Sequence, residues 1–314
     1  MAGGIQPINV LLQHIFAAPT KPVQAFGLNF ANPIGLAAGY DKDGLGWRGL
    51  ACLGFGHIEI GTVTPQPQPG NPKPRLFRLA SEGALINRLG FPGRGGDFVK
   101  KQLSGPRSKG LILGVNIGKN KDTPLDVAGQ DYLELLRSLY EVADYLTINV
   151  SSPNTVGLRR LQGKLELDHL LSQMVTERDR LAGSTLHKLP VLVKLSPDLS
   201  DEELVDALEV ILANHVEGIV ATNTTLSRQG VQSHLARESG GLSGKPLFTR
   251  SLEMVGKIYE QTNGKIPIVG VGGIDNTTSV QKMLDAGAVL VQIYTGLVFE
   301  GPGLVKKILR ELPR

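Results

Sequence analysis

The sequence predicts an α/β protein of the (β/α)8 type, a TIM barrel, with a short helical extension at the N-terminus. Eight apolar segments recur along the 314 residues, and each ends in polar residues or glycine. Segments with helical periodicity lie between most of them. The apolar segments are continuous, which is typical of parallel strands buried on both faces. A chain of this length ordinarily forms one barrel domain.

The expected strands follow the chain at residues 34–38, 57–64, 111–117, 145–150, 191–195, 218–222, 266–271 and 289–294. Helical periodicity is clearest at residues 133–142, 167–181, 202–212 and 280–286. A doubly wound sheet is the competing fold. It is disfavoured because no G-x-G-x-x-G motif follows the first strand, and the nearest glycine cluster lies near the end of the chain.

The N-terminal segment, residues 1–22, is predicted to contain one short amphipathic helix. Its apolar residues have helical spacing: Ile8, Leu11, Leu12, Ile15 and Phe16. Such a helix either docks on its own protein or contacts a membrane or an apolar ligand, and the pattern leaves both open. After Pro22, two short apolar pieces predict a hairpin that leads into the first strand, so the barrel domain is expected at residues 23–314.

Composition limits the possible partners. Charged residues make up 20% of the chain, the net charge is +4, and no lysine or arginine block is present, which argues against nucleic acid. The single cysteine, Cys52, excludes an internal disulfide and is expected to be a buried thiol. The six histidines are expected away from the strand ends, so we expect neither a metal site nor histidine acid/base chemistry. The sequence has no signal-peptide pattern and no apolar run long enough to span a bilayer.

Two connections, residues 65–110 and 226–250, are longer than a helix requires. In this fold, long loops after strands lie over the carboxyl ends of the strands and form lids or substrate walls.

The eight strand ends are all polar or rich in glycine, and a barrel brings such ends to one rim. They carry residues 37–42, Thr62, Asn116, Asn149 with Ser152 and Asn154, Lys194, Thr222 with Asn223 and Thr224, Gly272 with Gly273, and Tyr294 with Thr295. So many polar groups at one rim indicate a ligand site.

The side chains suggest the kind of ligand. Lys194 ends an apolar strand, so it must face an anion or lose its proton. Gly273 and the glycine-rich ends of the last two strands are typical of a phosphate held on backbone N–H groups. Asn87, Asn149, Asn154 and Asn223 both donate and accept, which suits a small planar ligand with alternating N–H and C=O edges.

Two further residues leave alternatives open. Lys42 can bind a substrate carboxylate or pair with its neighbour Asp41. Ser152 is the only candidate base at the rim, and a serine hydroxyl needs help, from Thr155 or from an ordered water that relays the proton.

These residues belong to a recognisable set of motifs. They are A-A-G-Y-D-K at Ala37, E-I-G-T-V-T-P-Q-P-Q-P-G-N-P-K-P-R at Glu59, N-R-L-G-F at Asn87, N-V-S-S-P-N-T at Asn149, T-N-T-T at Thr222, G-G-L-S-G-K-P-L at Gly240, G-V-G-G-I at Gly270 and V-Q-I-Y-T-G at Val291. From about Pro22 to the C-terminus the chain resembles the quinone-dependent class 2 dihydroorotate dehydrogenases.

The resemblance implies an FMN enzyme that oxidises dihydroorotate to orotate in pyrimidine (UMP) synthesis and passes the electrons to a membrane quinone. It implies peripheral attachment to the cytoplasmic side of the cell membrane. FMN would be held by Ala37, Ala38, Gly39, Tyr40, Asp41, Thr62, Asn116, Asn149, Lys194, Thr222, Gly244, Gly273, Tyr294 and Thr295. Substrate would meet Lys42, Asn87, Arg88, Leu89, Gly90, Phe91, Asn149, Asn154, Asn223 and Thr224.

The resemblance also implies catalytic roles for Ser152, Thr155 and Lys194. Ser152 would take a proton from C5 of the substrate while hydride leaves C6 for the flavin, with Thr155 as a possible relay. Lys194 would stabilise negative charge on the reduced flavin. Class 1 members have cysteine at the position of Ser152, so serine indicates class 2. Arg78 and Tyr294 would lie toward the quinone.

One feature differs from the family pattern, because class 2 members usually have two N-terminal helices that frame the quinone entrance. Here about twenty residues precede Pro22, which gives room for one short helix. Two rivals remain: an enzyme of the class 1 kind that uses a soluble acceptor or an iron–sulfur/FAD partner subunit, and a catalytically silent barrel that senses a phosphate ligand.

Overall fold

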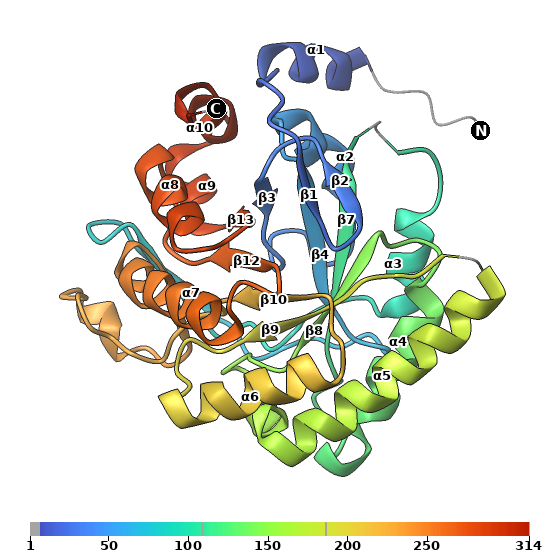
Figure 1. Ribbon diagram of the computed structural model, residues 1–314. Helices are drawn as coiled ribbons and strands as arrows, with labels where there is room; N and C mark the ends of the chain where they lie inside the picture. The colour runs from blue at the N-terminus through green and yellow to red at the C-terminus, as the bar shows by residue number, and fades with distance from the viewer. Residues whose placement is uncertain (1–6, 108–109, 186, 314) are drawn as a thin grey trace.

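Eight parallel strands close into a barrel in the computed structural model, which describes residues 7–107, 110–185 and 187–313 (Figure 1). Around the barrel, each strand is paired with its neighbour in the chain, and the last pairs with the first. The barrel strands are β3 (Ile34–Leu36), β4 (His57–Val63), β7 (Ile112–Ile117), β8 (Tyr145–Asn149), β9 (Val191–Leu195), β10 (Gly218–Ala221), β12 (Ile268–Val271) and β13 (Leu290–Ile293). All eight lie within the segments expected from the apolar pattern, so the predicted fold is confirmed.

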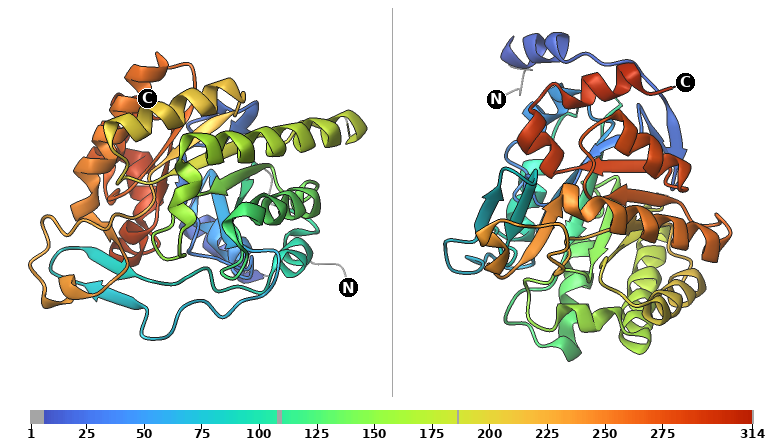
Figure 2. Two further views of the ribbon diagram at one scale, coloured as in Figure 1. Left: turned by 90° about the horizontal axis from the view of Figure 1, so that it is seen from below. Right: turned by 90° about the vertical axis from the view of Figure 1, so that its left-hand side faces the viewer.

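Helices lie around the outside of the barrel (Figures 1 and 2). They are α2 (Trp47–Leu50), α3 (Gly96–Leu103), α4 (Ala128–Leu139), α5 (Lys164–Thr185), α6 (Asp201–Ala213), α7 (Phe248–Thr262), α8 (Thr277–Asp285), α9 (Thr295–Glu300) and α10 (Leu304–Glu311). Sequence sets some of the starts: Ser200 and Glu203 form a capping box that begins α6, and Asn276 does the same with Ser279 for α8. The apolar faces of these helices and the outer faces of the strands form the main core.

A short hairpin precedes the first barrel strand, as predicted, and it covers the amino-terminal end of the barrel. Its strands are β1 (Val23–Ala25) and β2 (Leu28–Phe30). The ring of Phe30 lies 5.4 Å from that of His57, at the start of β4, with the planes nearly perpendicular. His57 is fully buried, and neither ring nitrogen has a hydrogen-bond partner in the described part of the chain. Burial lowers the pKa of His57 to about 3, so the ring is neutral.

The two long loops meet in a small antiparallel sheet, here called the roof sheet. It consists of β5 (Leu76–Leu79), β6 (Ala84–Asn87) and β11 (Gly241–Gly244), with β6 in the centre. The pairing places Asn87 opposite Gly241 and Ala84 opposite Gly244, although more than 150 residues separate these strands in the chain. The right-hand view of Figure 2 shows the three strands side by side.

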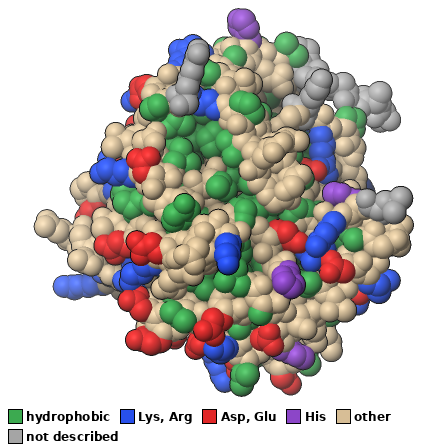
Figure 3. All heavy atoms as spheres, viewed as in Figure 1, with side chains coloured by type: hydrophobic (Ala, Val, Ile, Leu, Met, Phe, Trp, Pro, Cys, Tyr) green, Lys and Arg blue, Asp and Glu red, His purple; other side chains and the backbone are tan. Residues whose placement is uncertain are grey.

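The N-terminal helix α1 (Pro7–Ile15) confirms the helical expectation. It lies against the single turn at residues 51–53, and Lys306 donates to the Ile15 carbonyl at 2.6 Å. Leu11 and Ile15 remain 58% and 46% exposed. Figure 3 shows hydrophobic side chains gathered below this helix. The Ile8 side chain and residues 1–6 lie outside the described residues, so the division at residue 22 stays a prediction.

Two smaller expectations concern Cys52 and membrane-spanning segments. Cys52 is buried, as predicted. Within the described ranges, no helix combines the length and the apolar character needed to cross a bilayer.

Candidate active site

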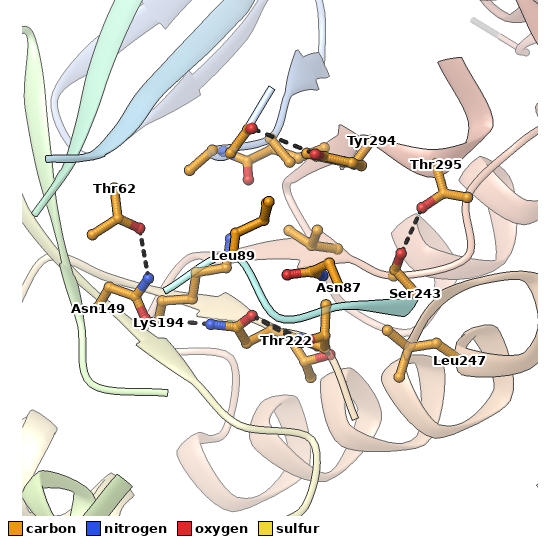
Figure 4. Close-up of a pocket in the computed structure, with 18 of the residues that line it drawn as sticks. Thr62, Asn87, Leu89, Asn149, Lys194, Thr222, Ser243, Leu247, Tyr294 and Thr295 are labelled. Atoms are coloured by element: carbon orange, nitrogen blue, oxygen red, sulfur yellow. Dashed lines mark hydrogen bonds between the residues drawn. The ribbon is translucent and has the colours of Figure 1, made fainter. Parts of the chain in front are cut away.

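A cavity opens at the carboxyl ends of the barrel strands, under the roof sheet. Its empty space is about 880 Å³ when the open mouth is included. In Figure 4, Thr62, Asn149 and Lys194 lie on one side, and Ser243, Tyr294 and Thr295 lie on the other. The lining therefore combines strand ends of the barrel with residues of both long loops.

One side of the cavity is a chain of hydrogen-bonded amides. Asn149 at the end of β8 donates to Thr62 Oγ1 at 2.9 Å and to Asn116 Oδ1 at 3.1 Å. Asn223 donates to Asn149 Oδ1 at 3.3 Å and to Ser151 Oγ at 2.9 Å. Asn116 is fully buried beneath the others, so it orients them without lining the cavity.

Below this chain, the barrel interior holds a buried carboxylate, Glu59 of β4. It accepts hydrogen bonds from Asn116 and Gln292, each at 2.9 Å, and from the hydroxyls of Thr147 and Tyr145, each at 3.2 Å. Burial, followed by the Glu59 charge, raises the pKa of the Tyr145 phenol well above its usual value, so this hydroxyl stays protonated and donates. The second polar atom of Gln292, Oε1, is buried without a partner among the described residues, and Gln292 lines the cavity.

Two lysines give the cavity positive charge. Lys194 is 5% exposed, and no hydrogen bond within the described ranges holds its ammonium group. Burial lowers the pKa of Lys194, and the Glu59 carboxylate opposes that shift. Burial also lowers the pKa of Lys42 to about 8, Asp43 opposes the shift, and Arg75 and Lys194 add to it. An anionic ligand would stabilise the charged form of both lysines.

The sequence left open whether Lys42 pairs with Asp41 or binds a substrate carboxylate. In the structure, Lys42 does not pair with Asp41. The Asp41 carboxylate instead accepts from the backbone N–H groups of Leu45 and Gly46, at 3.0 and 2.8 Å. The Lys42 ammonium is thus left facing the cavity.

The roof side is held to the Ser152 loop by amides. Asn154 donates to Asn87 Oδ1 at 3.1 Å, and Asn87 donates to the Gly241 carbonyl at 3.4 Å. The turn that follows Asn87 is fixed by Gln68, whose amide donates to the carbonyls of Gly90 and Phe91. Phe91 is 6% exposed and forms an apolar part of the lining.

The opposite end of the cavity is lined by glycines and hydroxyls. Gly273 has φ +71°, and a Cβ there would lie 2.8 Å from the backbone nitrogen of Phe248 at the start of α7. A larger residue therefore cannot replace Gly273 without a shift of the backbone. Ser243 and Thr295 hydrogen-bond to each other at 2.8 Å across this end. Close backbone and small hydroxyl groups are the surroundings that a phosphate group requires.

The structure brings most of the predicted site residues to this one cavity. Those that line it are Ala37, Ala38, Gly39, Lys42, Thr62, Asn87, Leu89, Gly90, Phe91, Asn149, Asn154, Lys194, Thr222, Asn223, Thr224, Gly244, Gly273, Tyr294 and Thr295. Six others do not line it: Tyr40, Asp41, Arg88, Asn116, Ser152 and Thr155.

These six residues lie beside the cavity in different ways. The Tyr40 ring lies edge-on to that of Tyr294, 5.6 Å away, and Arg88 forms an ion pair with Glu238 at 2.6 Å. Ser152 is 5% exposed, and its Oγ accepts from the backbone N–H of Asn154 at 3.2 Å. Thr155 is buried, and no hydrogen bond of the described residues joins it to Ser152. The roles predicted for the site residues stay predictions.

Sequence reasoning missed several residues. Glu59 and Gln292 each interrupt an apolar strand with a polar side chain, and that interruption was the signal available. Further lining residues come from the loops and the strand ends without such a signal: Ser243, Leu247, Val271 and Ile274. Among the described residues, no group of three or more His, Cys, Asp or Glu side chains is placed to hold a metal ion.

A barrel of this kind combines a buried lysine and a chain of amides with a glycine-lined end, surroundings that suit a planar polar ring and a phosphate group. A family model described as dihydroorotate dehydrogenase matches residues 21–314, and the chain belongs to that family. The resemblance found in the sequence is thereby confirmed.

Similar proteins carry the same name. The chain is 49% identical over 298 residues to "Dihydroorotate dehydrogenase (quinone)" of Burkholderia cenocepacia, covering 94% of this chain and 86% of that protein. It is 50% identical over 293 residues to the protein of that name from Idiomarina loihiensis, covering 93% and 87%. A crystal structure of the Eimeria tenella enzyme in complex with ferulenol superposes with a TM-score of 0.88 at 36% identity, covering 98% of this chain and 90% of that one.

Proposed function

We propose that this chain oxidises dihydroorotate to orotate with FMN and passes the electrons to a quinone, as a step of pyrimidine (UMP) synthesis. The names of its relatives support the reaction and the acceptor. The observation that carries the proposal is the cavity itself, in which the Lys194 ammonium, without a hydrogen-bond partner among the described residues, faces a chain of amides.

FMN fits the residues that are present. Gly244, Gly273 and Thr295 suit its phosphate, and Lys194 suits a ring that gains negative charge. The buried Gln292 Oε1 is an acceptor without a partner in the described ranges, as an N–H of a flavin ring would require. Bound FMN would supply hydride acceptance at the flavin ring.

Substrate would lie against the amides of Asn87, Asn154 and Asn223. An amide side chain has donor and acceptor groups, and those not engaged within the protein would meet the alternating edges of the dihydroorotate ring. For Asn223 this group is Oδ1, because both of its N–H bonds are engaged. The Lys42 ammonium would bind the substrate carboxylate, since Asp41 does not engage it. Phe91 would exclude water from the reacting atoms.

Ser152 would take the proton from C5 of the substrate. The N–H of Asn154 donates to Ser152 Oγ, which orients the hydroxyl and stabilises negative charge on it as the proton leaves. Thr155 is proposed as a relay, through a water molecule. Lys194 would stabilise the charge that accumulates on the cofactor side.

The quinone would approach from the side of α1, Arg78 and Tyr294. Leu11 and Ile15 are exposed apolar residues of α1 that suit contact with lipid or quinone. We propose that this segment rests on the cytoplasmic side of the cell membrane. Arg78 lies over the Phe299 ring at 4.5 Å.

Anaerobic mixing of the purified protein with dihydroorotate tests this function. Flavin absorbance near the visible maximum should bleach, and a short-chain quinone should restore it. A flavin that dihydroorotate leaves oxidised would contradict the proposal. Restoration by a soluble acceptor in preference to quinone would indicate a class 1 enzyme, and a protein without flavin would fit a phosphate sensor.

A further inference from the structure

We propose that Glu59 is a positioning residue that fixes which sides of the Asn116 and Gln292 amides donate and which accept hydrogen bonds. Glu59 is fully buried inside the barrel and does not line the cavity. All four of its partners are donors: two amide nitrogens and two hydroxyls. An ionised carboxylate only accepts, so it suits this set.

The carboxylate determines the orientation of Asn116. Because Glu59 Oε1 can only accept, the Asn116 nitrogen must face it, at 2.9 Å. Asn116 Oδ1 is then left to accept from Thr62 at 2.5 Å and from Asn149 at 3.1 Å. Asn149 Oδ1 in turn accepts from Asn223 at 3.3 Å. Three amides therefore donate in one direction, toward Glu59.

The orientation reaches the cavity at two places. Both N–H bonds of the Asn223 amide are engaged, by Asn149 and Ser151. Asn223 Oδ1 accepts from the backbone N–H of Thr224 at 2.8 Å, so this amide offers a ligand only the remaining acceptor capacity of Oδ1. Gln292 donates to Glu59, which leaves its Oε1 as the acceptor on the cavity side. An asparagine or glutamine amide can turn over at little cost when nothing fixes it. For Asn116 and Gln292 the carboxylate removes that freedom, whereas Asn149 and Asn223 are also held in this orientation by the backbone N–H groups of Ser151 and Thr224.

The test is the isosteric change Glu59→Gln. The new amide nitrogen would face either Asn116 or Gln292, both of which donate to this position, so one of the two must turn over. This rests on the proposed function, because the ligands used are FMN and orotate. FMN release from the holoprotein, followed by fluorescence, and orotate titration should show at least one dissociation constant raised by roughly tenfold or more.

Two further variants separate orientation from general damage. Tyr145→Phe removes the phenol's hydrogen bond to the same carboxylate and the longer one, at 3.4 Å, that the phenol accepts from Gln292 Nε2. Glu59 still accepts from Asn116 and Gln292, so both dissociation constants should stay within about threefold of the parent value. The double change Glu59→Gln with Asn116→Asp restores the pattern, because the new amide at 59 donates to the new carboxylate at 116. That carboxylate still accepts from Thr62 and Asn149, and ligand binding should recover.

Equal ligand binding in Glu59→Gln and Tyr145→Phe would overturn the inference, and so would a failure of the double variant to recover. If Glu59→Gln does not fold, the double variant is compared directly with the parent protein, and weakened binding in it overturns the inference. Side-chain amide NOEs report the turning of Asn116 or Gln292 without any ligand. These NOEs test the inference about Glu59 even in a protein that binds no ligand. A parent protein that binds neither FMN nor orotate would therefore refute the proposed function without refuting this inference.

Discussion

The affinity for orotate should depend on pH through Lys42. Its pKa of about 8 reflects burial first, with Asp43 opposing and Arg75 and Lys194 adding to the shift. The charged form that would bind a carboxylate predominates below pH 8 and is lost above it. Between pH 7 and pH 9 the charged fraction falls from about nine tenths to about one tenth, so the dissociation constant should rise about tenfold.

Lys42→Arg is the matched control, because a guanidinium keeps its charge across this range. Orotate is titrated into the oxidised holoprotein at half-unit steps of pH, and the change in flavin absorbance gives the dissociation constant. Subtracting the Lys42→Arg profile removes any titration of Lys194 or of the ligand. Parallel profiles for the two proteins, or an affinity that stays constant to pH 10, would refute this account of Lys42.

Three further predictions concern the base, the buried histidine and the N-terminal helix. Ser152→Ala should retain FMN but slow flavin reduction by dihydroorotate by about 10²- to 10⁴-fold in anaerobic stopped flow; an unchanged rate removes Ser152 from the mechanism. His57 stays neutral in the folded protein to pH about 3, whereas the unfolded chain takes up a proton below about pH 6.5, so stability is lost as pH falls. From pH 6.5 to 4.5 this costs about 2.3 kcal/mol of unfolding free energy, which urea titrations of His57→Leu should not show; equal acid sensitivity would contradict it. Leu11→Glu with Ile15→Glu should raise KM for quinone and leave KM for dihydroorotate unchanged, and an equal rise in both would indicate general destabilisation instead.

The barrel was predictable because its signal is local. Each parallel strand is a continuous apolar run with a polar end, and the order of strands around the barrel follows the order in the chain. Most of the cavity was predictable for the same reason, since Thr62, Lys194 and Asn223 all lie at strand ends. The barrel geometry alone brings such positions together.

The roof sheet was not predictable from the same reasoning. Residues 84–87 and 241–244 pair across more than 150 intervening residues, and the local sequence of neither segment predicts which strand it pairs with. The role of Glu59 could not be predicted from the sequence for a related reason. Its four partners come from β7, β8 and β13, and only the closed barrel turns these side chains toward one point.

The pairing of β6 with β11 determines where the protein tolerates changes in length. One residue added within 241–244 would turn Ser243 to the opposite face and separate its hydroxyl from Thr295. Residues added at 229–233, which precede the paired segment, would leave the ladder and the ligand contacts in register. Variation in loop length among engineered variants should therefore be confined to that outer segment, while the paired one keeps a constant number of residues.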